Sequence, residues 1–193
     1  MINIMNNIPI FELPILIILV IIRSIILHHY GIKTIVFGNT NKTDYFIIPI
    51  LFFFIYGIIS SLLNLPFPKF LTEAFWKIDI LNILSIIICS ISIIWFAITL
   101  KVFGKSFRVG IDINMAERLI VQGPFLISRN PIYVGFIVFF IGFFVAYSNI
   151  LSSVFLVIFI ILVHRQILRE EKFLKKHFGI EYEEYFKKVR RYI

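Results

Sequence analysis

Five apolar runs divide this chain of 193 residues, and no other feature constrains its fold as strongly. They cover residues 8–27, 45–63, 80–100, 132–147 and 150–163. A helix of about 20 apolar residues crosses the roughly 30 Å hydrocarbon core of a bilayer, where the backbone must satisfy its own hydrogen bonds. Hydrophobic residues make up 60% of the chain, against roughly 45–50% in soluble domains. The sequence predicts an all-α, polytopic transmembrane helical bundle with about five spans.

The last two runs are separated only by Ser148 and Asn149, which predicts a tight helical hairpin. Neither run reaches the usual spanning length by itself, so each borrows flanking polar residues or dips into the bilayer against the other helices. Beyond the final run, no Pro or Gly occurs before Gly179. We therefore expect the last spanning helix to continue out of the membrane and to end at that glycine.

Most of the 19 Lys and Arg residues lie in segment 101–131 and after residue 163. The hairpin brings these two regions to one side, and the positive-inside rule places that side, with the C-terminal region, in the cytoplasm. The first run lacks a basic leader and a small-residue cleavage site, so we interpret it as a retained span. In a membrane protein, a net charge of +8 favours anionic lipid headgroups over nucleic acid as partners.

The sequence indicates neither a disulfide nor a metal site. Cys89 is the single cysteine and lies inside an apolar run, so it cannot form a bridge within the chain. The four histidines show no spacing that would build a zinc site; they are His28, His29, His164 and His177.

A polar segment precedes the hairpin. Pro131 suits the first turn of a helix, and Arg129, Asn130 and Tyr133 surround that helix start. The start of a helix presents free N–H groups and partial positive charge, which suit an anion such as a carboxylate. Phe125 and Tyr133 add rings that can stack on a flat ligand.

A second polar segment follows the hairpin. Residues 167, 171, 174 and 178 share one helical face, on which Glu171 is the only charged residue. A carboxylate on such an apolar stripe is either paired or free to receive a cationic ligand. Gln166 and Glu170 form the adjacent face, with Arg165 and Arg169 beside them. Together the two segments fit a zwitterionic ligand that carries a heterocycle.

Each of these residues also has a purely structural interpretation. Glu170 and Glu171 are equally consistent with a solvated, salt-bridged helix face, and Arg129 with an anchor at lipid headgroups. Pro131 can serve the helix start alone, and Tyr133 can belong to an interfacial aromatic belt. The order and spacing of the residues, rather than any one of them, indicate a site.

Three stretches resemble one family of membrane enzymes. They are GKSFRVGI at 104–111, GPFLISRNPIYVG at 123–135 and EEKFLKKHFGIEYEEY at 170–185. These are similar to the isoprenylcysteine carboxyl methyltransferases and related phospholipid methyltransferases, and the resemblance covers about residues 100–193. It implies a methyltransferase that uses S-adenosylmethionine, with residues 1–100 supplying three spans and residues 101–193 forming the catalytic region.

The resemblance also implies a site on the cytoplasmic side and a lipophilic or lipid-anchored acceptor that enters from the bilayer. The implied cofactor contacts are Glu117, Arg118, Leu119, Ile120, Phe125, Arg129, Asn130, Pro131, Ile132, Tyr133 and Glu170. The implied catalytic residues are Glu170, Glu171, Arg165 and Gln166.

The chain departs from the family pattern at three positions. Asn130 replaces a histidine, Phe125 replaces a tyrosine, and Gln166 replaces an arginine that holds an acceptor carboxylate, although Arg165 is adjacent. A carboxylate acceptor, as in a prenylated cysteine, needs no base. The amine of a phospholipid must lose a proton, and we expect Glu170 or Glu171, its pKa raised by burial, to take it.

Two other classes of function remain open at this point. The first is a non-catalytic membrane subunit or transporter, in which the hairpin and the basic tail dock a partner. The second is a membrane reductase that uses NADPH, since some sterol reductases share a related C-terminal region.

Overall fold

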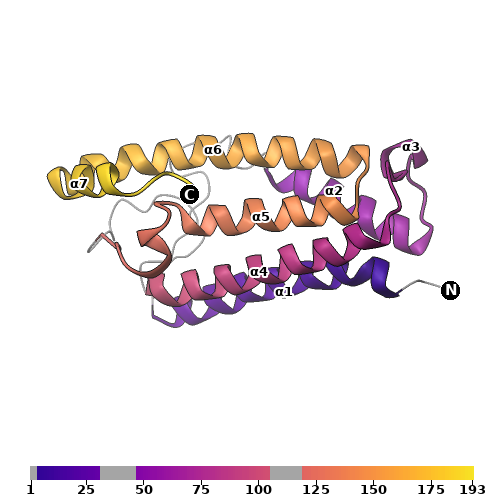
Figure 1. Ribbon diagram of the computed structural model, residues 1–193, viewed down its shortest axis with the longest axis horizontal. Helices are drawn as coiled ribbons and strands as arrows, with labels where there is room; N and C mark the ends of the chain where they lie inside the picture. Colours follow the sequence, from indigo (N-terminus) through magenta and orange to yellow (C-terminus); the bar gives the residue numbers. More distant parts are fainter. Residues whose placement is uncertain (1–3, 31–46, 105–118) are drawn as a thin grey trace.

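The computed structural model describes residues 4–30, 47–104 and 119–193, and its helices pack side by side as an elongated bundle (Figure 1). The elements are α1 (Ile4–His29), α2 (Ile47–Leu63), α3 (Lys69–Thr72), α4 (Asp79–Phe103), the 3-10 helix η3 (Gly123–Leu126), α5 (Pro131–Ala146), α6 (Ile150–Phe178) and α7 (Ile180–Lys188). In these ranges the only β pairing is an isolated parallel bridge between Ser128 and Arg190. The predicted all-α class is confirmed.

Three of these helices are long and apolar enough to cross a membrane, at Phe11–His29, Asp79–Phe103 and Ile150–Phe178. Two shorter apolar helices, Ile48–Leu63 and Pro131–Ala146, account for the other predicted spans. The 16 residues of α5 rise about 24 Å, less than the hydrocarbon thickness. The last span reaches full length because α6 continues well past its apolar part, 150–163, into a charged segment.

The seam between α4 and α5 is formed by small residues. Three α4 side chains donate hydrogen bonds to α5 carbonyls: Ser85 to Gly142 at 2.7 Å, Cys89 to Phe139 at 3.5 Å and Ser92 to Gly135 at 2.6 Å. A Cβ added at Gly142 would lie 2.8 Å from Ile88 Cγ2. Small residues let helix backbones approach closely in lipid, while α4 isoleucines such as Ile91 and Ile94 stay exposed on the outer surface.

Polar side chains also join α1 to α4. Ser90 Oγ donates to Oε1 of Glu12 at 2.7 Å, inside the bundle. Near the other end of α1, the guanidinium of Arg23 donates to the carbonyl oxygen of Gly104. Both bonds bury polar groups between helices, where each needs a partner.

The predicted hairpin between α5 and α6 is confirmed. Asn149 caps α6, because its side chain accepts from the Ser152 N–H at 2.9 Å and Ser152 Oγ accepts from the Asn149 N–H at 3.2 Å. These two bonds form a capping box. The indole of Trp76 donates to the Val145 carbonyl at 3.1 Å, which holds the end of α5.

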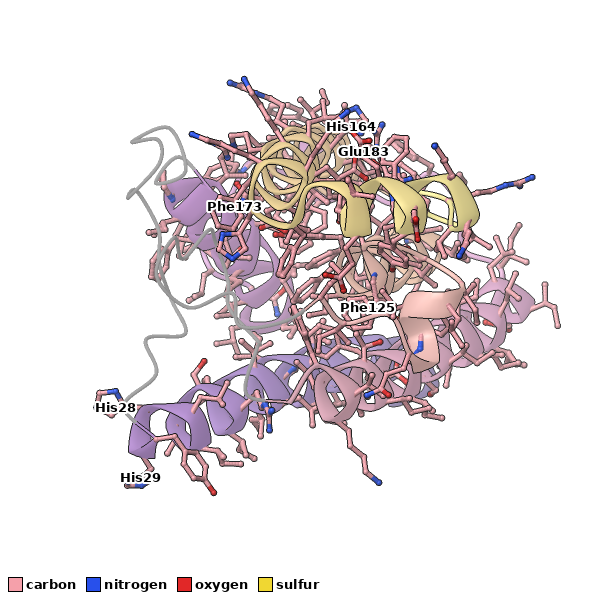
Figure 2. The ribbon with its side chains drawn as sticks, turned by 90° about the vertical axis from the view of Figure 1, so that its left-hand side faces the viewer. His28, His29, Phe125, His164, Phe173 and Glu183 are labelled. Carbon is pink, nitrogen blue, oxygen red and sulfur yellow. The ribbon has the colours of Figure 1, made fainter. Side chains whose placement is uncertain are left out.

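Helix α6 ends at Gly179, as the sequence predicts. Gly179 has φ +54° and ψ −121°, a conformation that suits glycine, and it turns the chain into α7. Tyr182, Tyr185 and Val189 are buried and pack against Leu174 and other apolar residues. Figure 2, seen from the left-hand end of Figure 1, shows α7 crossing that end of the bundle, with Phe125 beneath it.

Candidate functional site

Glu171 of α6 is the centre of a buried ionic cluster. Its Oε1 accepts from Arg129 Nη2 at 3.0 Å and from Asn130 Nδ2 at 3.3 Å, and its Oε2 accepts from Arg191 Nη2 at 2.8 Å. The Nε atoms of both arginines bond to the same carboxylate at 3.1–3.2 Å. We call Arg129, Asn130, Glu171 and Arg191 the Glu171 cluster.

The Glu171 cluster fixes the charge of its carboxylate. Glu171 lies beyond the apolar part of α6, in the charged segment. Burial raises the pKa of the carboxyl, but the hydrogen bonds and charges of Arg191 and Arg129 outweigh it and hold the pKa below its ordinary value. The expectation of a raised pKa is therefore wrong for Glu171, because its arginine partners reverse the effect of burial. A carboxylate with this many donors is a poor base.

Arg129 is buried too, with 6% of its side chain exposed. Besides Glu171, its Nη1 donates to the carbonyls of Phe186 at 2.8 Å and Val189 at 3.0 Å. The guanidinium carbon lies 3.8 Å from the centre of the Phe186 ring, a cation–π distance. The alternative interpretation of Arg129 as a headgroup anchor is wrong, because its charge is used inside the protein.

A second cluster joins the start of α5 to α6. Tyr133 Oη donates to Glu170 Oε1 at 2.5 Å, and Gln166 Nε2 donates to the same oxygen at 2.7 Å. Arg169 Nη2 donates to Gln166 Oε1 at 2.5 Å. All four side chains are half-buried. We call Tyr133, Gln166, Arg169 and Glu170 the Glu170 cluster; three of its members are site residues that the sequence proposed.

The remaining proposed residues on the η3 side are mostly packed. Leu119 contacts the tyrosine pair of α7, and Ile120 is buried. The Phe125 ring lies 5.1 Å from the Phe103 ring, and the Phe125 carbonyl accepts from Tyr185 Oη at 2.7 Å. Phe125 therefore contributes to packing in this structure.

Three further proposed residues are described, and two are not. Pro131 is buried, and its carbonyl accepts from the Trp95 indole at 2.8 Å. Ile132 packs against the bundle core, and Arg165 is exposed. Glu117 and Arg118 lie outside the described residues.

Sequence reasoning missed Arg191 as a member of the Glu171 cluster. Its only sequence signal was membership of a basic tail, which also contains the exposed Arg190. Tyr185 and Ser128 were missed as well, and each bonds a residue about 60 positions away. The sequence placed Arg169 beside the Gln166 and Glu170 face but did not assign it to the site, although it lies three residues after Gln166 on the same helix.

If S-adenosylmethionine binds here, as the resemblance implies, the Glu170 cluster offers it the more accessible carboxylate. The cofactor carries a cationic sulfur and an ammonium group, so it needs a carboxylate within reach of its site. Glu170 is half-buried at the edge of the helix pair, whereas Glu171 is 6% exposed and surrounded by its own cations.

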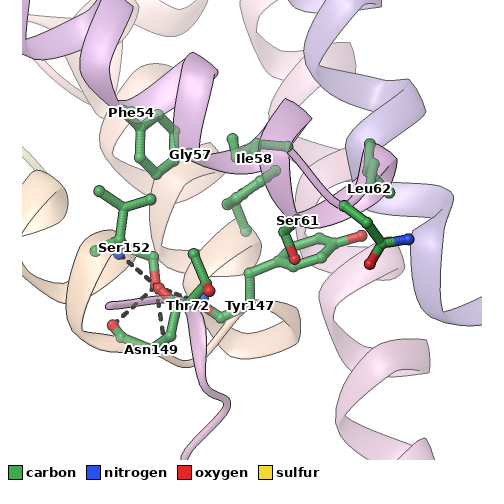
Figure 3. A pocket seen from close by; sticks show the side chains of 12 residues that line it. Phe54, Gly57, Ile58, Ser61, Leu62, Thr72, Tyr147, Asn149 and Ser152 are labelled. Atoms are coloured by element: carbon green, nitrogen blue, oxygen red, sulfur yellow. Dashed lines mark hydrogen bonds between the residues drawn. The ribbon is translucent and has the colours of Figure 1, made fainter. Parts of the chain in front are cut away.

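A cavity of about 320 Å³ opens at the other end of the bundle, between α2, α3 and the α5–α6 turn (Figure 3). Phe54 and Phe143 contribute apolar walls, and Ser61, Thr72 and Asn149 contribute polar ones. None of the residues that line it is charged, and none belongs to either cluster. Its lining therefore offers no carboxylate to a cationic ligand.

Comparison with known proteins agrees with the motifs of the sequence. Two curated rice proteins, from Oryza sativa subsp. indica and subsp. japonica, are each described as a probable protein-S-isoprenylcysteine O-methyltransferase. Each is 36% identical to this chain over 89 residues, which are 45% of this chain and 47% of the relative. The chain thus spans about half the length of these curated relatives.

The family match is longer and covers every member of both clusters except Arg191. Residues 78–181 match the phospholipid methyltransferase family, and this segment runs from the start of α4 into α7. The match and the three long apolar helices identify a membrane protein. Because the matched residues make up more than half of the chain, the protein belongs to the phospholipid methyltransferase family.

Proposed function

We propose that this protein is an integral membrane methyltransferase that moves a methyl group from S-adenosylmethionine to a lipophilic acceptor. The observation that carries the proposal is the family match over residues 78–181, which includes all of α5 and α6. The Tyr133–Glu170 bond at 2.5 Å supports it, because it brings the two sequence motifs together beside a carboxylate.

S-adenosylmethionine, when bound, supplies a methyl group on a cationic sulfur, and the sulfur keeps the bonding electron pair when an acceptor takes the methyl. The protein's task is therefore to position both molecules and to exclude water. We assign Glu170 to the cationic part of the cofactor and Tyr133 and Gln166 to holding that carboxylate in place. We assign Glu171 a structural role, in which its ion pairs with Arg129 and Arg191 hold the site together.

The acceptor decides whether the site needs a base. A carboxylate acceptor is already ionised, and Gln166 or the exposed Arg165 would bind it. An ammonium acceptor must first lose a proton, and Glu170 is the carboxylate better placed to take it, since Glu171 is held by two arginines. We assign this chemistry to residues 101–193, on the cytoplasmic side of the membrane.

The decisive experiment incubates the purified protein in detergent with methyl-labelled S-adenosylmethionine and a total lipid extract. Mild base then splits the product. Label released as volatile methanol identifies a carboxyl ester, and label that remains non-volatile after base treatment identifies a base-stable bond such as N-methyl. The Glu170→Gln variant should fold and lose at least about a hundredfold in turnover.

Two negative results together would refute the proposed function. If no fraction is labelled and calorimetry detects no S-adenosylmethionine binding, the chain is not a methyltransferase. Heat stabilisation by NADPH rather than by S-adenosylmethionine would then favour the reductase class, and stabilisation by neither would favour a non-catalytic subunit or transporter.

A further inference from the structure

The segment Val189–Tyr192, which follows α7, returns to the loop before α5. The Arg129 N–H donates to the Arg190 carbonyl at 2.9 Å, within the isolated parallel bridge. The Arg191 carbonyl accepts from Ser128 Oγ at 3.1 Å and from Asn130 Nδ2 at 3.2 Å. These backbone carbonyls thus bind three consecutive residues of the loop.

Side chains of the same segment reach α6. Arg191 makes both of the hydrogen bonds that Glu171 Oε2 accepts among the described residues, at 3.1 and 2.8 Å. Tyr192 Oη and His164 Nδ1 share a hydrogen bond of 2.6 Å. The segment therefore connects the loop before α5 to two positions of α6 about two turns apart.

The position of Glu171 determines where Glu170 points. Adjacent residues of a helix lie about 100° apart around its axis, so fixing one side chain limits the rotation of the helix at the other. Arg191 holds Glu171 from the α7 side, and Arg129 holds it from the α5 side. Glu170 is thereby held where Tyr133 reaches it.

We propose that segment Val189–Tyr192 is a clamp that positions the Glu170 cluster, with Arg191 as its principal positioning residue. The inference rests on the proposed function, because the clamp acts on the site assigned to S-adenosylmethionine. Arg191 does not touch the reacting groups; it sets the geometry of α6 against α5 through Glu171.

The test compares Arg191→Ala with Arg190→Ala, which removes the same charge from the neighbouring, exposed side chain. Binding of S-adenosylmethionine is measured by calorimetry, well below the melting temperature of each variant. The clamp predicts a loss of affinity of about tenfold or more for Arg191→Ala, since small displacements of positioning groups have effects of this size. It predicts no change for Arg190→Ala.

The Arg191→Lys variant keeps the test informative if Arg191→Ala does not fold. Lysine keeps the positive charge but lacks the planar fork that bonds a carboxylate twice. We expect Arg191→Lys to melt close to the wild-type temperature and to recover only part of the affinity. Equal affinities of wild type, Arg191→Lys and Arg190→Ala would overturn the proposal.

The pH dependence of binding separates positioning from general destabilisation. Arg129, Arg191, Tyr182 and Tyr192 face the Glu171 carboxyl, and Arg191 holds its pKa low. Without Arg191 this pKa rises, so the loss of cofactor affinity on acidification should begin at a higher pH than in the wild type. The Arg190→Ala curve should coincide with the wild type, and an unshifted Arg191→Ala curve counts against the clamp.

The two proposals fail in different ways. If wild-type protein binds no S-adenosylmethionine, the proposed function fails. If the wild type binds it and Arg191→Ala binds as well as Arg190→Ala at every pH, only the clamp fails.

Discussion

Glu170 and Glu171 are adjacent, yet their carboxylates have different partners. Among the described residues, Glu171 accepts from the charged or amide groups of the Glu171 cluster, and both of its oxygens are bonded. Glu170 accepts from a phenol and an amide through Oε1. Both of these donors are neutral, whereas the donors to Glu171 include two arginines.

Replacing Glu171 by Gln should unbalance the cluster. The amide keeps the size of the side chain but leaves the buried Arg129 and the part-exposed Arg191 without a counter-ion. Removing one partner of a buried ion pair costs about 3 kcal/mol or more. The free energy of unfolding in detergent should fall by about this amount, and a loss no larger than that of Arg190→Ala would contradict it.

Acidification should weaken the same ion pairs. The pKa of Glu171 is lower in the folded protein than its ordinary value of 4.5, so its stabilisation is complete above that pH and is lost as the pH falls through the folded pKa. Melting temperatures measured from pH 6 down to about pH 3 should fall more steeply for the wild type than for Glu171→Gln. Parallel curves would show that another group causes the loss.

Among the helices, the α4–α5 seam depends on two glycines, Gly135 and Gly142, which lie on the same face of α5 about two turns apart. A Cβ at Gly142 would lie 2.8 Å from Ile88 Cγ2 and 2.9 Å from Cys89 Sγ, whereas a Cβ at Gly135 would meet its nearest atom at 3.3 Å. Gly142→Ala should cost about 1–3 kcal/mol, and Gly135→Ala less. Thermal unfolding of both variants checks the order, and equal losses would refute it.

The turn between α6 and α7 depends on the backbone of Gly179 rather than on space. No atom lies within 4 Å of a Cβ added there, but its φ is +54°. Gly179→Ala should therefore cost about 1–3 kcal/mol through backbone strain alone. Trypsin should cut the α7 lysines faster in this variant than in Gly104→Ala, where a glycine with a similar φ of +55° ends α4 instead of α6. Equal cutting rates would mean that the turn does not hold α7.

At the scale of the whole molecule, the clusters and the cavity of Figure 3 lie at opposite ends of the bundle. Positive charges gather at the cluster end, and we propose that this end faces the cytoplasm. The single cysteine, Cys89, is fully buried, so the wild type offers a low labelling background.

Cysteines placed at Ile180 and at Glu73 should therefore report sidedness. Both positions are exposed; Ile180 is the first residue of α7, and Glu73 directly follows α3. In sealed, oriented vesicles, a membrane-impermeant maleimide should label Ile180→Cys from the cytoplasmic face and Glu73→Cys from the other. Labelling of both from one face would refute the topology, and wild type serves as the unlabelled control.

The long apolar helices, and the pairing of α5 with α6, follow from the sequence alone. Lipid leaves helical backbone no outside partners, so an apolar run such as 80–100 or a two-residue break at Ser148 and Asn149 has few possible structures. The end of α6 at Gly179 and the burial of the Ile167–Glu171 face also follow from local pattern, because helical periodicity fixes which side chains share a surface.

Which carboxylate the two arginines hold depends on the tertiary structure. That choice depends on Arg191, whose position requires α7 to turn at Gly179, to pack its tyrosines against Leu174 and to return its following segment to Ser128. Helical periodicity does not predict such contacts, because the bonded residues are some 20 to 60 positions apart in the sequence. Local sequence pattern therefore determines the long helices, whereas long-range packing determines which cations pair with Glu171.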